Sequence, residues 1–437
     1  MKTNLMMKKT QLKQLVALTI FSIFTLFSCN KKEDTENIPI EDGLTILQQY
    51  VVDNQDLPEH FAGLPEDPNV FGYQDLYNEL LNLSDTLYEQ HTFSKVTYSS
   101  TDNHGNPITL SGLLINPTHG IHDGTPIISH NHGTELEKKL APSQFVPGQS
   151  SPGDFAEVMI AWLYSAMNNW VVIMPDYQGM GEDVSELHPY CIKDRLAVST
   201  ADMLEAAKKT IKSKFNASWQ GNSYIMGYSE GGYVTMAALE ELEKRNVELK
   251  GAVIMEGPYD LSGSMREVML ADTAFPVPYF LPMMLVGYND IYPDYFKFEE
   301  MLVSPYDTAI PEYTTGFYST DFVNNLMPAD HILKEVLTES FIDSLNNTNS
   351  NAHQALYENN TYINWIPTTE TFIWHCENDD CVPFGNFLKV KSVFGSPSNI
   401  TYKQYPPLVP IFHTIHQTAA PIAFLDGAGW IIERERE

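Results

Sequence analysis

Basic side chains are scarce in this 437-residue sequence, which has 26 Lys and Arg against 56 Asp and Glu and a formal net charge of −30. The first 28 residues hold four lysines and no acid, so the remainder carries 22 − 56 = −34. Nucleic-acid binding depends on Lys and Arg that neutralise phosphates, so this balance argues against nucleic acid as a partner. It also gives no preference for anionic lipid headgroups.

The amino-terminal region lacks an apolar run long enough to cross a membrane. The run from Leu15 to Phe27 is too short for a transmembrane helix. It follows several lysines and leads into Ser28-Cys29, which is typical of a signal peptide over residues 1–28. Leu26-Phe27-Ser28-Cys29 resembles a bacterial lipobox, which implies that Cys29 becomes the first residue and carries diacylglycerol. An ordinary signal peptide with an incidental cysteine is the alternative.

Residues 29–48 are polar and acidic, and we expect them to form a flexible tether because they cannot bury a core. Their start, Lys31-Lys32-Glu33-Asp34, resembles the surface-export signal of Bacteroidota lipoproteins. We therefore predict a cell-envelope lipoprotein anchored through Cys29 in the outer membrane. Display on the surface and on the periplasmic face both remain open.

Cysteine is also scarce, with four in the chain. If Cys29 is lipidated, Cys191, Cys376 and Cys381 remain, so at most one intrachain disulfide can form. In an oxidising compartment Cys376 and Cys381 would be the natural pair, closing a short loop around Asp379. Two buried thiols are the alternative.

Short apolar runs alternate with helical patterns along most of the chain. This alternation predicts an α/β fold with a mostly parallel central sheet, covered by helices on both faces, and chemistry at the carboxyl edge of the strands. The core would comprise residues 49–256 and 366–437. The strands are expected at residues 95–100, 108–115, 126–130, 170–174, 223–226, 252–255, 371–374 and 400–405.

Residues 257–365 break the alternation and are rich in Tyr, Phe, Met and Pro. A long insertion after a strand projects across the carboxyl edge of a sheet, so we expect a cap there, with a helix near Ala329 to Leu345. The stretch from Phe275 to Phe298 is too apolar to lie exposed. It would either form the core of the cap or line an acyl pocket beneath it.

The most informative motif is Gly227-Tyr228-Ser229-Glu230-Gly231-Gly232, between an apolar strand and a helical pattern. A GxSxG motif in this context forms a sharp, strained turn that presents the serine hydroxyl, with glycines where strand and helix nearly touch. Ser229 is therefore the predicted nucleophile.

A serine hydroxyl needs an imidazole to remove its proton, and the imidazole needs a carboxylate to fix its tautomer. Asp379 is the expected acid because it follows a strand directly, and His416 is the expected base because a helix starts there. His413 is the alternative base. Glu377 and Asp380 lie beside the expected acid, and Glu256 and Asp260 would supply it in a rarer variant. His375, at the end of a strand, is expected to be structural.

The oxyanion formed by attack on a carbonyl needs two fixed N–H donors. We expect one from the backbone of Glu230 and the other from the loop that contains Gly133 and Thr134. His130 and His132 have a spacing that would suit a metal, but no acidic or cysteine ligand follows nearby, so no metal or cofactor is expected.

Together these segments resemble an α/β-hydrolase close to the secretory lipase type. The resemblance rests on Ser129 to Thr134 with Ala141-Pro142-Ser143, Pro175 to Gly181, Gly227 to Gly232, Asn364-Trp365-Ile366-Pro367, and Asp379 to Pro383. It implies carboxylic ester hydrolysis without a cofactor, on a small-molecule, lipid or glycan ester. Two departures stand out: Cys376 replaces the usual glycine, and the carboxylate of Glu230, beside the nucleophile, would disfavour anionic esters.

Three other functions remain open. One is a glycan deacetylase or feruloyl esterase, because the sequence does not specify the acyl group. Another is a serine peptidase of the prolyl-peptidase type, although fewer than 100 residues precede the first expected strand, too few for the propeller that such enzymes carry. The third is a surface binding protein without catalysis, against which the presence of all three triad residue types argues.

Overall fold

A computed structural model describes residues 32–33, 43–53, 90–102, 105–151, 153–184 and 186–436. The predicted signal peptide (1–28), Cys29 and most of the predicted tether lie outside the described residues. Within the described ranges, every helix is too short or too polar to span a bilayer.

In the described ranges, the central sheet has ten strands in the order β1-β2-β3-β4-β6-β5-β7-β8-β9-β10. From β6 to β10 all neighbours are parallel, whereas β1 to β4 pair antiparallel and β4 also runs antiparallel to β6. The strands are β1 (Lys32–Glu33), β2 (Thr45–Asp53), β3 (Gln90–Thr101), β4 (Pro107–Pro117), β5 (Ile127–Asn131), β6 (Val171–Pro175), β7 (Ser223–Tyr228), β8 (Gly251–Met255), β9 (Thr371–Cys376) and β10 (Ile400–Tyr405).

The prediction of a mostly parallel sheet is confirmed. Strands β5 to β9 are buried along their whole length, as expected for parallel strands that have helices on both faces. Each of the eight expected strands overlaps an observed one.

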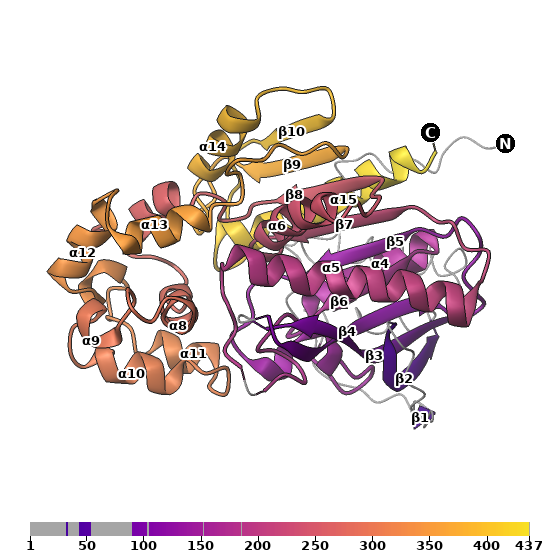
Figure 1. Ribbon diagram of the computed structural model, residues 1–437, viewed down its shortest axis with the longest axis horizontal. Helices are drawn as coiled ribbons and strands as arrows, with labels where there is room; N and C mark the ends of the chain where they lie inside the picture. The colour runs from indigo at the N-terminus through magenta and orange to yellow at the C-terminus, as the bar shows by residue number, and fades with distance from the viewer. Residues whose placement is uncertain are drawn as a thin grey trace, which may run out of the picture.

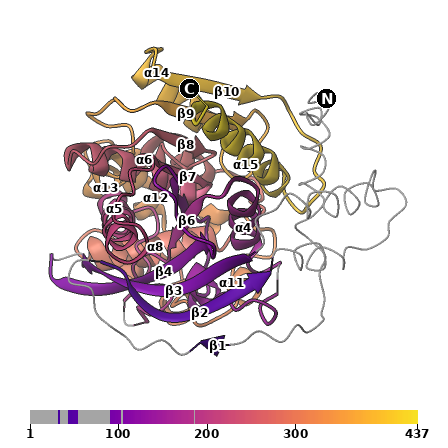
Figure 2. The same ribbon diagram turned by 90° about the vertical axis from the view of Figure 1, so that its right-hand side faces the viewer.

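Helices cover both faces of the sheet, as Figures 1 and 2 show. Helices α4 and α15 pack on one face, where their apolar side chains join those of β6, β7 and β9 in one core. The opposite core contains residues of α5, α6 and α14. These helices are α4 (Ala156–Asn168), α5 (Lys193–Thr210), α6 (Glu230–Lys244), α14 (Gly385–Phe394) and α15 (Ile415–Arg434).

The segment between β8 and β9 forms a group of short helices beyond one edge of the sheet, in orange in Figure 1. Its apolar residues share a core with Tyr177, Tyr190 and Tyr233 of the sheet domain, which fixes the cap on it. The helices are α7 (Arg266–Met269), α8 (Phe280–Ile291), α9 (Phe298–Met301), α10 (Tyr306–Tyr313), α11 (Thr320–Asn324), α12 (Glu339–Asn346) and α13 (Asn351–Glu358).

The helix expected over residues 329–345 is wrong in its start. His331 has φ 56°, a left-handed conformation that interrupts a helix. A short 3₁₀ turn follows at Leu333–Val336, and α12 begins only at Glu339, where the Thr338 side chain accepts a hydrogen bond from the backbone N–H of Phe341.

The sheet also begins earlier than the expected core boundary at residue 49. Strand β2 starts at Thr45 and pairs with β3, and the preceding Leu44 is fully buried in the core. The backbone N–H of Leu44 donates to the hydroxyl of Thr210 at 2.7 Å. The last residues of the range expected as a tether, from Gly43 on, therefore belong to the folded domain.

Candidate active site

Ser229 lies at the turn between β7 and α6, at the carboxyl edge of the sheet. Its backbone has φ 60° and ψ −126°, a conformation that residues with a Cβ rarely adopt. A Cβ at Gly227 would overlap the backbone of Gly231, and one at Gly231 would overlap the carbonyl of Asn131. Both glycines are thus required by the close approach of strand and helix, as the motif predicts.

Asp379 and His416, which are distant in sequence, meet in a buried contact. The Nδ1 atom of His416 lies 2.5 Å from Oδ2 of Asp379. The other carboxylate oxygen of Asp379 accepts from the backbone N–H groups of Cys381 and Val382, both at 2.8 Å. The carboxylate is thereby held by three donors, which fixes its orientation toward the imidazole.

The start of α15 brings His416 to this position. Thr414 caps the helix by accepting from the N–H of Gln417. The carboxylate of Asp380 accepts from the N–H groups of Ile415 and His416, at 3.0 and 3.2 Å. Asp380 therefore ties the helix to the acid loop, while the neighbouring His413 is exposed.

Two of the alternative acids, Asp260 and Glu377, have partners other than His416. The carboxylate of Asp260 accepts from Ser264 N–H and from the hydroxyl of Tyr362, and Glu377 contacts the side-chain amide of Gln404. His375 is fully buried, with Nε2 2.9 Å from the carbonyl of Val382. Burial lowers the pKa of His375 to about 4, so it is neutral at pH 7.

The charges of the Asp379–His416 pair stabilise each other. Burial lowers the pKa of His416, but the charge and hydrogen bond of Asp379 outweigh this and raise it above its usual value. Burial in turn raises the pKa of Asp379, and the nearby imidazole overcomes that effect and holds it well below its usual range. Nε2 of His416 is buried and has no hydrogen-bond partner among the described residues. That nitrogen is the one left to exchange a proton.

Tyr228 connects the end of β7 to the start of α15. Its hydroxyl lies 2.7 Å from the carbonyl oxygen of His416, and its ring centre lies 4.9 Å from the imidazole centre. Since Ser229 is the next residue, this contact holds the turn and the start of α15 together. The described contacts include no direct hydrogen bond between Ser229 and His416.

In the loop expected to complete the oxyanion site, one of the expected donors already has a hydrogen-bond partner. The N–H of Gly133 donates to Oε1 of Glu157 at 2.8 Å, and the other oxygen of that carboxylate lies 2.8 Å from Nε2 of His130. The Gly133 N–H is thus engaged in this structure, contrary to the expected free donor. The N–H groups of Thr134 and Glu230 make no hydrogen bond within the described part of the chain. Both N–H groups are therefore available as hydrogen-bond donors.

Sequence reasoning did not identify His188 as a partner of Glu230. Its Nε2 lies 2.6 Å from Oε1 of Glu230, whose second carboxylate oxygen is buried and unpartnered among the described residues. The imidazole therefore contacts the carboxyl group that Glu230 places beside Ser229.

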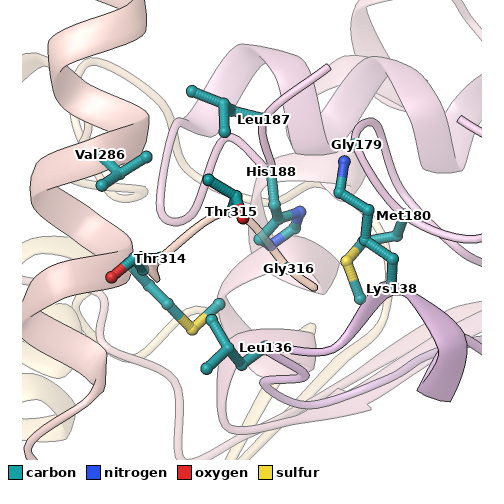
Figure 3. Close-up of a pocket in the computed structure, with 11 residues that line it drawn as sticks. Leu136, Lys138, Gly179, Met180, Leu187, His188, Val286, Thr314, Thr315 and Gly316 are labelled. Atoms are coloured by element: carbon teal, nitrogen blue, oxygen red, sulfur yellow. The ribbon is translucent and has the colours of Figure 1, made fainter. Parts of the chain in front are cut away.

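His188 also lines a pocket between the cap and the core (Figure 3). The pocket is small and partly open to solvent. Most of its wall is apolar, and the cap contributes Met283 and Val286 from α8. The full lining is Leu136, Lys138, Gly179, Met180, Leu187, His188, Met283, Val286, Thr314, Thr315 and Gly316.

Among the described residues, two groups of ligand-type side chains come close enough to suggest a metal. They are Glu256, His375 and Asp379, and Asp379, Asp380 and Cys381. Asp379 belongs to both, and both of its carboxylate oxygens already accept from N–H donors that a cation would displace. These contacts favour a hydrogen-bonded network over a metal centre.

The three cysteines in the described part of the chain are thiols. Cys191, Cys376 and Cys381 are free and buried, so the disulfide considered between Cys376 and Cys381 is not formed. Burial raises the pKa of all three, which keeps them protonated at neutral pH.

Residues 157–273 match the prolyl oligopeptidase family. This segment contains the Ser229 turn but not Asp379 or His416. A comparison with curated proteins found no match.

Solved structures resemble nearly the whole chain. A Legionella pneumophila protein, whose hydrolase assignment is itself provisional, has 22% identity, covers 89% of this chain and 96% of its own, and gives a TM-score of 0.74. A rice cell wall degrading esterase, LipA from Xanthomonas oryzae, has 20% identity with coverages of 91% and 100% and a TM-score of 0.73. Lipase A of Candida antarctica has 15% identity, coverages of 75% and 74%, and a TM-score of 0.57. The chain has the α/β-hydrolase fold.

Proposed function

We propose that this α/β-hydrolase is a serine hydrolase that cleaves carboxylic esters through an acyl-enzyme. The observation that carries the proposal is the buried contact of 2.5 Å between His416 and Asp379, formed at the sheet edge where the strained Ser229 turn lies. The matched serine hydrolase family and the esterases and lipases among its structural neighbours support it.

The proposed reaction uses these three side chains in turn. Ser229 Oγ attacks the ester carbonyl, and its proton passes to Nε2 of His416, the nitrogen without a partner. Asp379 accepts the hydrogen bond from the Nδ1 proton and stabilises the imidazolium. For the same reason it raises the pKa of His416. The N–H groups of Glu230 and Thr134 receive the oxyanion. His416 then passes that proton to the alcohol as the ester C–O bond breaks. Water, deprotonated by His416, attacks the acyl-enzyme, and the acid leaves as the proton returns to Ser229 Oγ.

The decisive experiment combines activity with covalent labelling. The wild-type protein should hydrolyse p-nitrophenyl butyrate and react with a fluorophosphonate probe at Ser229, as identified by mass spectrometry of the labelled peptide. Ser229→Ala should do neither. An active protein labelled at another residue would refute the proposal, and so would a folded wild type that turns over no activated ester and takes no label.

A second candidate function is a serine peptidase, favoured by the match of residues 157–273 to the prolyl oligopeptidase family. Both reactions use the same triad, so substrates must separate them. Hydrolysis of a proline-containing peptide p-nitroanilide with kcat/KM above that of the p-nitrophenyl ester would establish the peptidase.

The pocket beside His188 suggests the acyl group. We infer that it receives a short acyl chain, because its wall includes Leu136, Met283 and Val286 and because His188 contacts Glu230, the neighbour of Ser229. Each buried methylene contributes about 0.8 kcal/mol, so kcat/KM should rise severalfold from acetate to butyrate or hexanoate esters. A flat or falling profile would contradict this.

A strict preference for acetyl would instead indicate a glycan deacetylase. Cell-wall esters are the alternative substrate class because LipA of Xanthomonas oryzae is described as degrading the rice cell wall. Release of acetate or ferulate from substituted glycans would distinguish the two alternatives.

We also propose that the enzyme is a lipoprotein of the outer membrane, anchored through Cys29. The support is the sequence alone: the basic start, the short apolar run and the lipobox-like Leu26-Phe27-Ser28-Cys29.

A further inference from the structure

Glu256 follows β8 directly and is fully buried beside the proposed triad. Its φ of 45° is a left-handed value that a residue with a Cβ rarely adopts. One carboxyl oxygen accepts from the N–H of Cys376 at 2.7 Å. The other lies 3.4 Å from Nδ1 of His416, the nitrogen that Asp379 contacts at 2.5 Å. Two carboxyl groups therefore converge on one side of the imidazole.

The hydrogen atoms available in this cluster require a protonated carboxyl. The Tyr228 hydroxyl contacts both the carbonyl oxygen of His416 and Oε2 of Glu256, and the Glu256 side chain also contacts that of Asp379. These are three contacts between oxygen atoms. If both carboxyl groups were ionised, the Tyr228 hydroxyl would supply the only hydrogen, and one hydrogen cannot serve all three contacts. Asp379 already accepts from two backbone N–H groups and His416, so the proton belongs on Glu256.

The electrostatic environment also favours a protonated Glu256 and an ionised Asp379. Burial and the neighbouring Asp379 raise the pKa of Glu256 well above its usual range, whereas the pKa of Asp379 is lowered. The other titratable side chains around the two carboxyls and the imidazole are Tyr228 on β7, His375 and Cys376 on β9, and Asp380 and Cys381 in the acid loop.

We propose that Glu256 is a positioning residue that acts as a neutral second acid: it holds Asp379 against His416 and becomes the ionised partner of His416 Nδ1 when Asp379 loses its carboxylate. The proposal rests on the proposed roles of His416 and Asp379. In this role Glu256 would do more than fill space, and it would be an acid additional to the three residues of a conventional triad.

The test is a double-mutant cycle with Asp379→Asn and Glu256→Gln, both close in shape to the native side chains. Glu256→Gln alone should cost at most about tenfold in kcat, since glutamine can still donate to Asp379. Asp379→Asn should cost about 10²-fold, less than the roughly 10⁴-fold of a triad with one acid. The double variant should fall at least tenfold below the product of the two single effects. Multiplicative effects would overturn the proposal.

A matched control is Asp260→Asn, which changes another buried carboxylate of the same segment that has no contact with His416. It should show no coupling to Asp379→Asn. Equal coupling would mean that the Glu256 effect is a general loss of packing.

A readout independent of turnover separates this proposal from the proposed function. In proton NMR, the low-field Nδ1 proton of His416 should persist in Asp379→Asn, because Glu256 accepts it, and disappear in the double variant. If Asp379→Asn does not fold, Glu256→Gln decides alone. Replacing a neutral acid should move the His416 titration midpoint by less than one pH unit, and a larger fall would show that Glu256 is ionised. Loss of activity in Ser229→Ala tests the proposed function separately.

Discussion

Replacing Ser229 with glycine should abolish activity and stabilise the fold at the same time. The backbone at Ser229, with φ 60° and ψ −126°, is one that glycine adopts freely and that other residues adopt at a cost of about 1–3 kcal/mol. Glycine also adds about 0.5–1 kcal/mol of conformational entropy to the unfolded chain. The difference predicts that the free energy of unfolding of Ser229→Gly rises by about 1 kcal/mol.

Ser229→Ala is the matched control, because it removes the same hydroxyl but retains the Cβ and therefore the strain. Its free energy of unfolding should stay within about 0.5 kcal/mol of the wild-type value. Both variants should lose at least about 10⁴-fold in kcat on p-nitrophenyl butyrate, since each lacks the proposed nucleophile.

Urea unfolding followed by tryptophan fluorescence measures the stability difference, and steady-state hydrolysis measures the activity. A glycine variant no more stable than the alanine variant would show that the turn stores no backbone strain. Turnover within tenfold of wild type in either variant would remove Ser229 from its assigned role, whatever the stability result.

Three further predictions concern the histidines and the proposed anchor. His416→Ala should be nearly as damaging to kcat as Ser229→Ala, and His413→Ala much less so, because only His416 contacts Asp379; equal losses would misplace the base. The unfolded chain protonates His375 at its ordinary pKa of 6.5 and the folded chain only at about 4, so stability should be complete above pH 6.5 and fall by up to about 3 kcal/mol as pH drops to 4. Urea unfolding should show a smaller fall in His375→Asn. Cys29→Ala should abolish fatty-acid labelling and membrane fractionation without changing kcat, and an unlabelled wild type would refute lipidation.

The central strands could be predicted from the sequence because a buried parallel strand is a continuous apolar run between breakers. The Ser229 turn was equally accessible, since its glycines are imposed by local backbone approach. β2 was missed because its residues Thr45–Asp53 mix apolar and polar side chains at the antiparallel side of the sheet, where all of them except Val52 are only half-buried. The helix expected from Ala329 failed because periodicity does not reveal the left-handed backbone of His331.

The contacts that distinguish this site join residues that no local pattern connects. His188 reaches Glu230, Glu157 reaches Gly133, and Glu256 reaches both Asp379 and His416. Each pair places a carboxylate next to a group of the proposed machinery, so the strongly acidic composition is present inside the site as well as on the surface. Burying a carboxyl group at such a position costs little free energy only if it is paired with a histidine, accepts a hydrogen bond from an N–H group or carries a proton. Those partners come from different elements, and the fold had to be known before their roles could be assigned.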